Sequence, residues 1–219
     1  MKTALRRYGI PTVLDKLIRM AASMFLERMR RIGFPAISTM SLLSLAEKYK
    51  CEHCEVKNVN SDPLYKRVNE FGPEVIVVSA FSQILKNRIL ALPPRGCINM
   101  HPSLLPRYRG PSPEYWIVRN KEPRSGVTVH YLDGGIDSGD IALQREFPTN
   151  PGETRNSLHR RAAIAGASLV VEALGLIRAD RVERQEQKEE EATYYPFPRM
   201  RSSGKRLAVA RLKQLLISG

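Results

Sequence analysis

The feature that most constrains the fold is a short apolar run, EVIVVSA at 74–80, rich in β-branched residues. Such a run suits a strand that is covered on both faces of a sheet. Segments with helical spacing surround it, and further strand-like runs follow along the chain. We expect helices at 41–50, 63–71, 111–120 and 154–177, and strands at 74–80, 96–101, 126–133 and 140–147. This alternation predicts an α/β fold.

Both ends of the chain differ from this central part. Apolar residues recur at helical spacing over 11–33, and a short basic helix is expected over 205–216. The apolar stripe of the first segment favours packing against the body or a missing segment over lying on a membrane surface. We therefore divide the chain into a basic helical segment, a catalytic domain and a shortened C-terminal extension, at 1–40, 41–178 and 179–219.

The net charge of +13 comes from the two ends. Residues 1–40 carry eight Lys or Arg against two acids, and 199–219 carry six against none, so the centre is nearly neutral. Basic ends of this kind bind phosphate, rest on an anionic membrane or are simply solvated. Three cysteines and no apolar signal peptide favour a reducing compartment, by default the cytoplasm. An ordinary membrane-spanning helix is not expected, since no apolar run is long enough.

Two further stretches carry no predicted site. CEHC at 51–54 has the spacing of half a zinc site, but a structural site needs four ligands, so no metal is expected. Residues 180–191 are dense in charge and lack periodicity, which indicates a solvated connector.

Polar residues stand where a buried strand ends, in CINMHPSLLPRYRG at 97–110. Asn99 and His101 are two residues apart, so they project to the same side of a strand that Pro102 ends. The glycine-rich stretch LDGGIDSGDI at 132–141 lacks the strand-turn-helix context of a phosphate-binding loop. It predicts a tight loop with Asp137 at its tip, away from the core.

Taken together, NMHPSLLPRYRGPSP and GVTVHYLDGGIDSGDI resemble the catalytic domain of the folate-dependent formyltransferases. The resemblance runs from about residue 41 to 195. It implies a Rossmann-like domain with a mostly parallel central sheet, and 10-formyltetrahydrofolate as the formyl donor. It also implies that Asn99, His101 and Asp137 form the catalytic trio. Formyl transfer passes through an oxyanion that needs fixed donors, which an amide and an imidazolium supply, and a carboxylate can take the amine's proton.

The same resemblance implies the binding residues. Folate would lie against the loop after the strand at 74–80 and against the glycine-rich loop that carries Asp137, which we call the aspartate loop. The residues concerned are Phe81, Gln83, Ile84, Leu85, Asp133 and Gly135. The stretch at 81–85 also reads as a helix start with Ile84 and Leu85 buried. The acceptor side would be lined by Ser103, Arg107 and Arg109. The two arginines would contact a phosphate of the amine substrate, or do nothing as surface residues.

The chain departs from the family at both ends. Family members begin with a strand, a glycine turn and a helix, which we expect to be absent here or encoded upstream of Met1. The barrel domain with which methionyl-tRNA formyltransferase helps to hold tRNA is also not expected. These departures favour an amino-sugar nucleotide as acceptor, with methionyl-tRNA as the alternative. A hydrolase that deformylates folate, and an inactive relative that binds nucleic acid through its basic arms, remain as further alternatives.

Overall fold

The computed structural model describes residues 42–198, so the helices expected at 11–33 and 205–216 lie outside the described residues. The described chain falls into two compact units, one containing 42–57 and the other 58–198. The first holds a single helix, α3 (Leu42–Lys48), where the sequence predicted one. None of the helices within 42–198 is long and apolar enough to cross a membrane.

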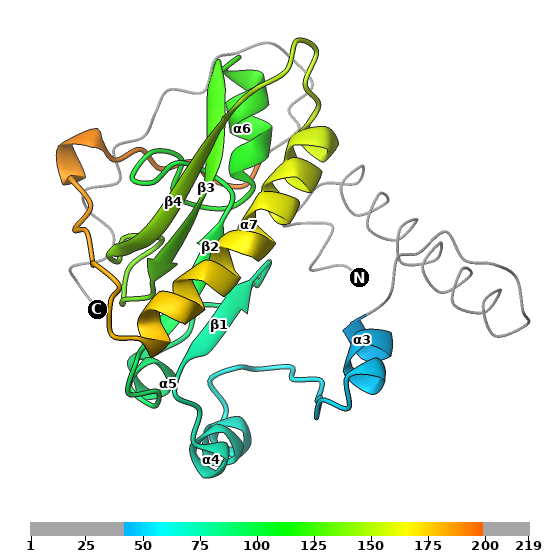
Figure 1. The fold of residues 1–219 in the computed structure, drawn as a ribbon, viewed down its shortest axis with the longest axis vertical. Coiled ribbons are helices and arrows are strands. Elements are labelled where there is room, and N and C mark those ends of the chain that lie inside the picture. The colour runs from blue at the N-terminus through cyan, green and yellow to red at the C-terminus, as the bar shows by residue number, and fades with distance from the viewer. Residues whose placement is uncertain (1–41, 199–219) are drawn as a thin grey trace, which may run out of the picture. The chain divides into compact units, whose positions relative to one another are not determined.

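The larger unit contains all of the described strands (Figure 1). Its elements, in chain order, are α4 (Asp62–Phe71), β1 (Ile76–Ser79), α5 (Asn87–Leu90), β2 (Cys97–His101), α6 (Pro113–Arg119), β3 (Arg124–Tyr131), β4 (Ile141–Pro148), α7 (Arg155–Arg178) and the 3₁₀ turn η1 (Glu189–Glu191). Each strand and helix predicted between 63 and 177 is present within a few residues of its expected bounds. The α/β class is confirmed.

Local sequence signals explain where two of the helices begin and end. Thr154 caps α7, because its side-chain oxygen accepts a hydrogen bond from the Ser157 N–H at 3.2 Å. Helix α4 ends at Gly72, whose φ of 61° lies in the left-handed region that glycine adopts without strain.

The four strands form one sheet in the order β1-β2-β3-β4. Strand β1 pairs parallel with β2, whereas β2–β3 and β3–β4 are antiparallel pairs. The described part of the sheet is therefore mixed, where the resemblance led us to expect a mostly parallel one. For β3 and β4 the reason lies in their connection, because the loop at 132–140 contains no crossover helix and so joins antiparallel neighbours. Strands β2 and β3 also run antiparallel, although α6 lies between them in the chain.

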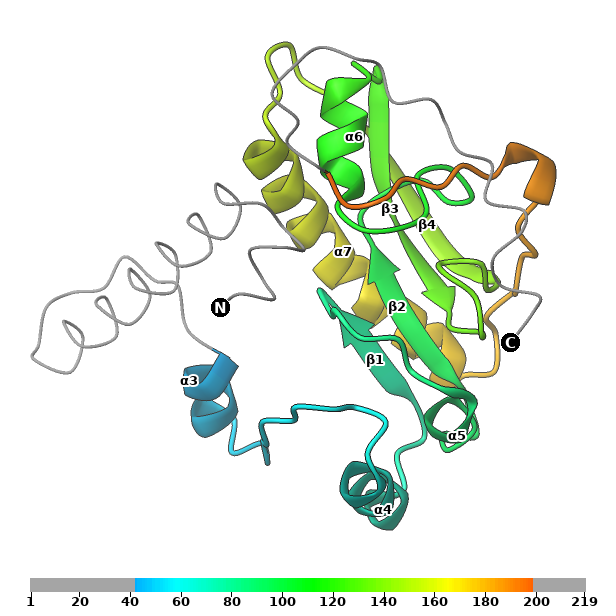
Figure 2. The same cartoon turned by 180° about the vertical axis from the view of Figure 1, so that it is seen from behind.

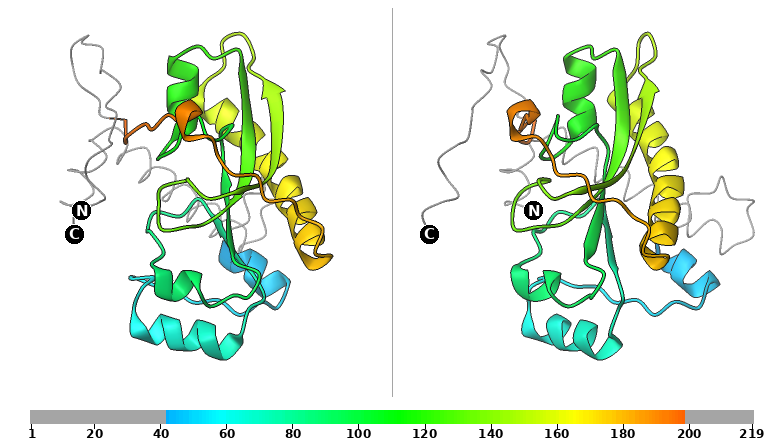
Figure 3. Two further views of the ribbon diagram at one scale, coloured as in Figure 1. Left: turned by 90° about the vertical axis from the view of Figure 1, so that its left-hand side faces the viewer. Right: turned by 60° about the vertical axis from the view of Figure 1, so that its left-hand side comes forward.

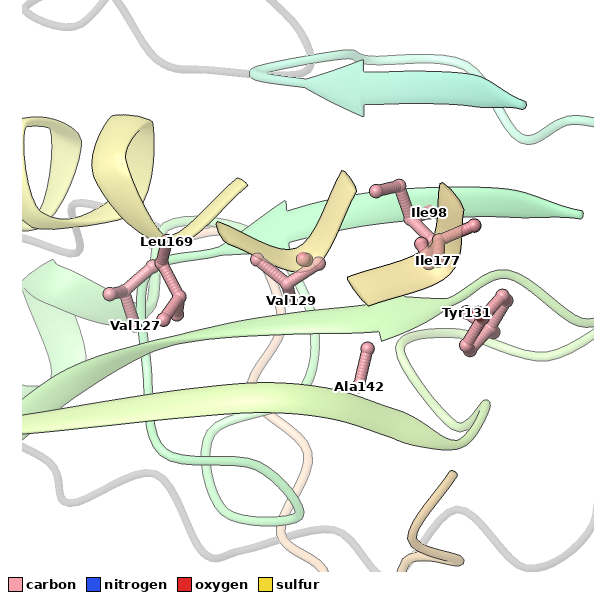
Figure 4. Packing of buried hydrophobic residues seen from close by; sticks show 8 residues of the cluster. Ile98, Val127, Val129, Tyr131, Ala142, Leu169 and Ile177 are labelled. Carbon is pink, nitrogen blue, oxygen red and sulfur yellow. The ribbon is translucent and has the colours of Figure 1, made fainter. Parts of the chain in front are cut away.

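Alternation along β2 and β3 gives the sheet two different faces. On one face Ile98, Val127 and Val129 are fully buried and pack with Leu169 and Ile177 of α7 (Figure 4). Burying each such aliphatic side chain stabilises the fold by roughly 1.5–3 kcal/mol. Figure 3 shows α7 against this face, with the loop at 132–140 on the opposite side.

The segment after α7 does not behave as a solvated connector, and that prediction was wrong. Gln185 forms a two-way backbone bridge with Ile141, the N–H of each donating to the carbonyl of the other. Gln187 is buried, and Tyr194 pairs with Arg109 further along. The segment crosses the side of the sheet away from α7 (Figure 2). Its inward-facing residues are few and stand between charged, exposed ones, so the sequence of the segment shows no periodicity that would predict their burial.

Candidate active site

The second face of the sheet carries polar side chains in adjacent rows. Asn99 of β2 lies directly opposite His130 of β3, and His101 lies opposite Thr128. Since side chains two residues apart share a face, all four project to the side away from α7. His101, Thr128 and His130 are each at most 5% exposed, so these polar groups are held in a largely dry environment.

His130 orients the amide of Asn99. Its Nδ1 lies 2.8 Å from the Tyr131 carbonyl oxygen, which can only accept, so Nδ1 carries the hydrogen. Nε2 therefore accepts from Asn99 Nδ2 at 3.1 Å. Burial lowers the pKa of His130, while the carboxylate of Asp137 acts in the opposite direction. A neutral His130 leaves the second N–H of the Asn99 amide for another acceptor.

His101 is fixed in the same way. Its Nε2 donates to the Tyr108 carbonyl oxygen at 2.8 Å, which leaves Nδ1 as the ring atom available for chemistry. Nδ1 lies 3.6 Å from Asp137 Oδ2, beyond ordinary hydrogen-bond length. The imidazole and the carboxylate therefore face each other without being locked together.

Asp137 reaches these histidines because its loop folds back over the polar face. The loop leaves the sheet beside Cys97, where the Leu132 N–H donates to the Cys97 carbonyl oxygen. Oδ2 of Asp137 accepts from the Gly110 N–H at 2.8 Å, and Oδ1 lies 3.6 Å from His130 Nε2. The structure thus brings together Asn99, His101 and Asp137, as predicted. Their arrangement, an amide N–H, an imidazole nitrogen and a carboxylate, can polarise a carbonyl and accept a proton.

Thr128 anchors the loop that follows β2. Its hydroxyl donates to the Ser103 carbonyl oxygen at 2.7 Å and accepts from the Leu105 N–H at 3.2 Å. Gln144 of β4 adds a hydrogen bond to the same hydroxyl at 2.8 Å and one to the Leu105 carbonyl oxygen at 2.9 Å. The SLLP stretch (103–106) is therefore held by side chains of β3 and β4.

The residues predicted to bind folate lie in two loops. Phe81 and Ile84 are 47% and 63% exposed, and no helix forms at 81–85, so the expectation of a helix start with a buried Ile84 was wrong. Leu85 is buried, and the side-chain oxygen of Gln83 accepts from the Val59 N–H at 3.0 Å. Two apolar side chains of this loop, Phe81 and Ile84, are therefore exposed.

In the aspartate loop, Asp133 accepts hydrogen bonds from the Gly135 N–H and the Ser138 hydroxyl, both at 2.9 Å. A Cβ placed on Gly135 would lie 2.1 Å from Ser138 Oγ, so a larger residue would displace that hydroxyl from its hydrogen bond with Asp133. The contacts of Asp133 thus shape the turn that precedes Asp137.

The residues predicted on the acceptor side differ from one another. Arg107 is exposed and pairs with Glu122 at 2.7 Å. Ser103 is fully buried, and its hydroxyl donates to the Arg107 carbonyl oxygen at 2.9 Å. Arg109 is not a surface arginine, because it is only 8% exposed and its guanidinium donates to Gln187 and Glu189. These placements favour structural roles for Ser103 and Arg109, while phosphate contact by Arg107 stays a prediction.

Sequence reasoning missed His130, Thr128 and Gln187. The first two had a signal, since GVTVHYLD alternates apolar and polar residues over 127–131 and so places Thr128 and His130 on one face. Gln187 had none, because the residues it contacts lie between 48 and 78 residues away along the chain. Within 42–198, no group of three or more His, Cys, Asp or Glu is placed to hold a metal ion.

Comparison with known proteins shows the family of the chain. Residues 32–174 match the protein-family model described as formyl transferase. Among curated proteins, the chain is 46% identical over 137 residues to methionyl-tRNA formyltransferase of Syntrophus aciditrophicus, covering 62% of this chain and 44% of that protein. It is 39% identical over 155 residues to the enzyme of the same name from Desulforamulus reducens, covering 71% and 49%. The chain thus spans about half the length of the curated relatives it matches.

Among solved structures, the fold is similar to an N-formyltransferase from Helicobacter canadensis in complex with folinic acid and dTDP-3-aminofucose. The TM-score is 0.58 at 25% identity, covering 75% of this chain and 56% of that one.

Proposed function

Since this chain belongs to the formyl transferase family, we propose that its larger unit transfers a formyl group from 10-formyltetrahydrofolate to a primary amine. The observation that carries this proposal is the convergence of Asn99, His101 and Asp137 from two distant segments, with His101 Nδ1 3.6 Å from Asp137 Oδ2. A lone histidine or aspartate is common in a structural role, but three groups of complementary chemistry around one point indicate a reacting centre.

In the first step the amine nitrogen attacks the formyl carbon, and a C–N bond forms while the carbonyl oxygen becomes negative. The free N–H of Asn99 and the Nδ1–H of a protonated His101 donate to that oxygen. Losing one such donor typically costs about 3 kcal/mol of transition-state stabilisation. His130 contributes by holding the Asn99 amide in a single orientation.

In the second step the intermediate collapses. Asp137 accepts the proton that the attacking amine loses, directly or through a water molecule. The bond between the formyl carbon and N10 of the folate breaks, N10 takes up one proton, and the oxygen returns to a carbonyl. The products are a formamide and tetrahydrofolate, so one proton leaves the amine and one arrives at N10.

The folate would lie between the loop after β1 and the aspartate loop. The exposed Phe81 and Ile84 offer apolar contacts for a planar ring, together with Gln83 and Leu85. Asp133 and Gly135 form the opposite side. The two loops approach each other, because a Cβ built on Gly134 lies 3.8 Å from Asn87 Oδ1 just beyond the first loop. The complexed folinic acid of the H. canadensis enzyme supports a folate as donor.

For the acceptor, the relatives favour methionyl-tRNA over our first expectation of an amino-sugar nucleotide. The curated proteins named methionyl-tRNA formyltransferase are 46% and 39% identical to this chain, whereas the sugar-bound structure is 25% identical. The basic residues of 1–40 and 199–219 also suit an RNA phosphate backbone. An amino-sugar nucleotide remains the second candidate, supported by the dTDP-3-aminofucose in that solved complex.

The test is release of tetrahydrofolate by the purified full chain, supplied with 10-formyltetrahydrofolate and either methionyl-tRNA or dTDP-3-aminofucose. We expect formylated product with one acceptor, and a rate lowered at least about 100-fold in His101→Ala and in Asp137→Asn. Asp62→Asn is the matched control, because Asp62 is an exposed carboxylate on α4 that pairs only at the surface with Arg88.

Three outcomes would contradict the proposal or change its acceptor. Release without any acceptor would identify a folate hydrolase. Salt-dependent tRNA binding with no formyl transfer would indicate an inactive binding relative. Wild-type rates in both site variants would show that the trio is not catalytic.

A further inference from the structure

Gln187 contacts the backbone of the aspartate loop, and both the oxygen and the nitrogen of its side-chain amide form hydrogen bonds. It is 5% exposed and comes from the segment after α7. Its Oε1 accepts from Arg109 Nε at 3.1 Å and from Arg109 Nη2 at 2.9 Å. Its Nε2 donates to the carbonyl oxygens of Asp137 at 2.9 Å and Gly139 at 2.7 Å. The amide thus connects an arginine beside the SLLP loop to the backbone of the aspartate loop.

The backbone that Gln187 holds is strained. Asp137 has a φ of 52°, in the left-handed region, which costs a non-glycine residue of order 1 kcal/mol or more. That conformation places the carboxylate between His101 and His130, within 3.6 Å of each. Two hydrogen bonds to the carbonyls on either side of Ser138 oppose relaxation of the turn. If the turn relaxed, the backbone could remain folded while the carboxylate moved.

We propose that Gln187 is a positioning residue, which aims the Asp137 carboxylate by fixing the loop that carries it. The inference rests on the proposed formyl transfer, since it assigns Gln187 a part in that reaction. Arg109 fixes the orientation of the Gln187 amide. Its two N–H groups hold the Gln187 amide with oxygen toward Arg109 and nitrogen toward the loop, so the donor cannot turn away.

Two substitutions separate positioning from simple packing. Gln187→Glu keeps an oxygen for Arg109 but sets a second oxygen against the two loop carbonyls, so the pairing with Arg109 survives and the loop loses its donor. Gln187→Met keeps the approximate shape and removes both sets of hydrogen bonds. Gln185→Met is the matched control, because Gln185 lies two residues away in the same segment with an exposed side chain.

We expect kcat to fall about 10- to 100-fold in Gln187→Glu and Gln187→Met, as for a reacting group displaced by about 1 Å, and to stay unchanged in Gln185→Met. The KM for the amine acceptor should not change. In an Asp137→Asn background, Gln187→Glu should cause little further loss, because it acts through a carboxylate that is already gone. Fully additive losses would overturn the proposal.

A second readout does not depend on activity. The Gly110 N–H donates to Asp137 Oδ2 at 2.8 Å, so its amide NMR signal reports where the carboxylate lies. The signal should move in both Gln187 variants and stay in place in Gln185→Met. If the wild type transfers no formyl group but the signal moves, the proposed function fails while the positioning contact stands. An unmoved signal, wild-type kcat in Gln187→Glu, or loss of folding in both variants would each overturn the positioning role.

Discussion

The buried, neutral His130 should make the stability of this protein depend on pH in a defined window. His130 is fully buried, and burial lowers its pKa from the ordinary 6.5 to about 4. Above pH 6.5 the folded and unfolded states are both neutral at this residue. Below 6.5 the unfolded chain takes up a proton that the folded chain still refuses, so acid favours unfolding. Stability at this site is therefore lost as the pH falls from about 6.5 toward about 4.

The size of the effect follows from the same two values. A tenfold change in proton affinity corresponds to about 1.4 kcal/mol, so a pKa that falls from 6.5 to about 4 corresponds to about 3 kcal/mol. Domains of this kind unfold with only about 5–15 kcal/mol, so the loss should be large enough to measure. The negative charge of Asp137 raises the pKa of His130, and so opposes the larger effect of burial, which lowers it.

The assay is urea unfolding, followed by circular dichroism, at a series of pH values from about 7 to about 4. The comparison is His130→Gln, because a glutamine oxygen can still accept from Asn99 Nδ2 but does not titrate. Groups that do not interact with His130 titrate alike in both proteins and cancel in the difference. The wild type should lose about 3 kcal/mol more than the variant over this window. Parallel curves for the two proteins would refute the reasoning.

Three further predictions concern packing and the loops, each checked by the free energy of unfolding in urea. Leu169→Ala should lower the free energy of unfolding by about 2–5 kcal/mol, because the leucine side chain is 2% exposed. Val171→Ala on the same helix should lower it by less than about 0.5 kcal/mol, because Val171 is 70% exposed. Equal losses would contradict the assigned face of α7. Gly110→Ala should cost more than about 1 kcal/mol, since φ is 97° and the new Cβ would lie 2.4 Å from the Tyr195 carbonyl oxygen; a neutral result would be incompatible with that contact. Thr128→Val should cost about 1–3 kcal/mol, because the buried partners of its hydroxyl lose their hydrogen bonds, and an unchanged stability would show that the SLLP loop does not need this anchor.

The parts of this fold that follow from local pattern were predictable. The run at 74–80, the cap at Thr154 and the two-residue spacing of Asn99 and His101 each depend on neighbours in sequence, and the structure contains the strand, the cap and the spacing. The expectation that this strand is covered on both faces was wrong for the described residues, because β1 stands at the end of the described strand order and Val77 is 43% exposed. The meeting of Asp137 with that pair followed from the family resemblance alone, because nothing in the glycine-rich stretch specifies the direction in which the loop folds.

Long-range contacts explain the failures. The buried role of Gln187 depends on Arg109 and on the carbonyls of Asp137 and Gly139, which no spacing rule connects to it. Arg109 was expected at the surface for the same reason, since an arginine in a polar loop is usually solvated. The mixed strand directions were missed because we followed the family resemblance in expecting a mostly parallel sheet, although the loop at 132–140 is too short for a crossover helix and favours the antiparallel pairing of β3 with β4.

The alternation on β2 and β3 has a consequence for how this protein can change over time. Substitutions at 98, 127 and 129 change the packing against α7, whereas substitutions at 99, 101 and 130 change side chains on the opposite, polar face. A point mutation at one of these positions thus changes one face and leaves the side chains of the other face in place. A single-codon insertion or deletion within either strand cannot do so, because it would turn that strand's imidazole toward α7 and its aliphatic side chains toward the polar face at the same time. Variation in length is therefore confined to the connecting segments beyond the strand ends.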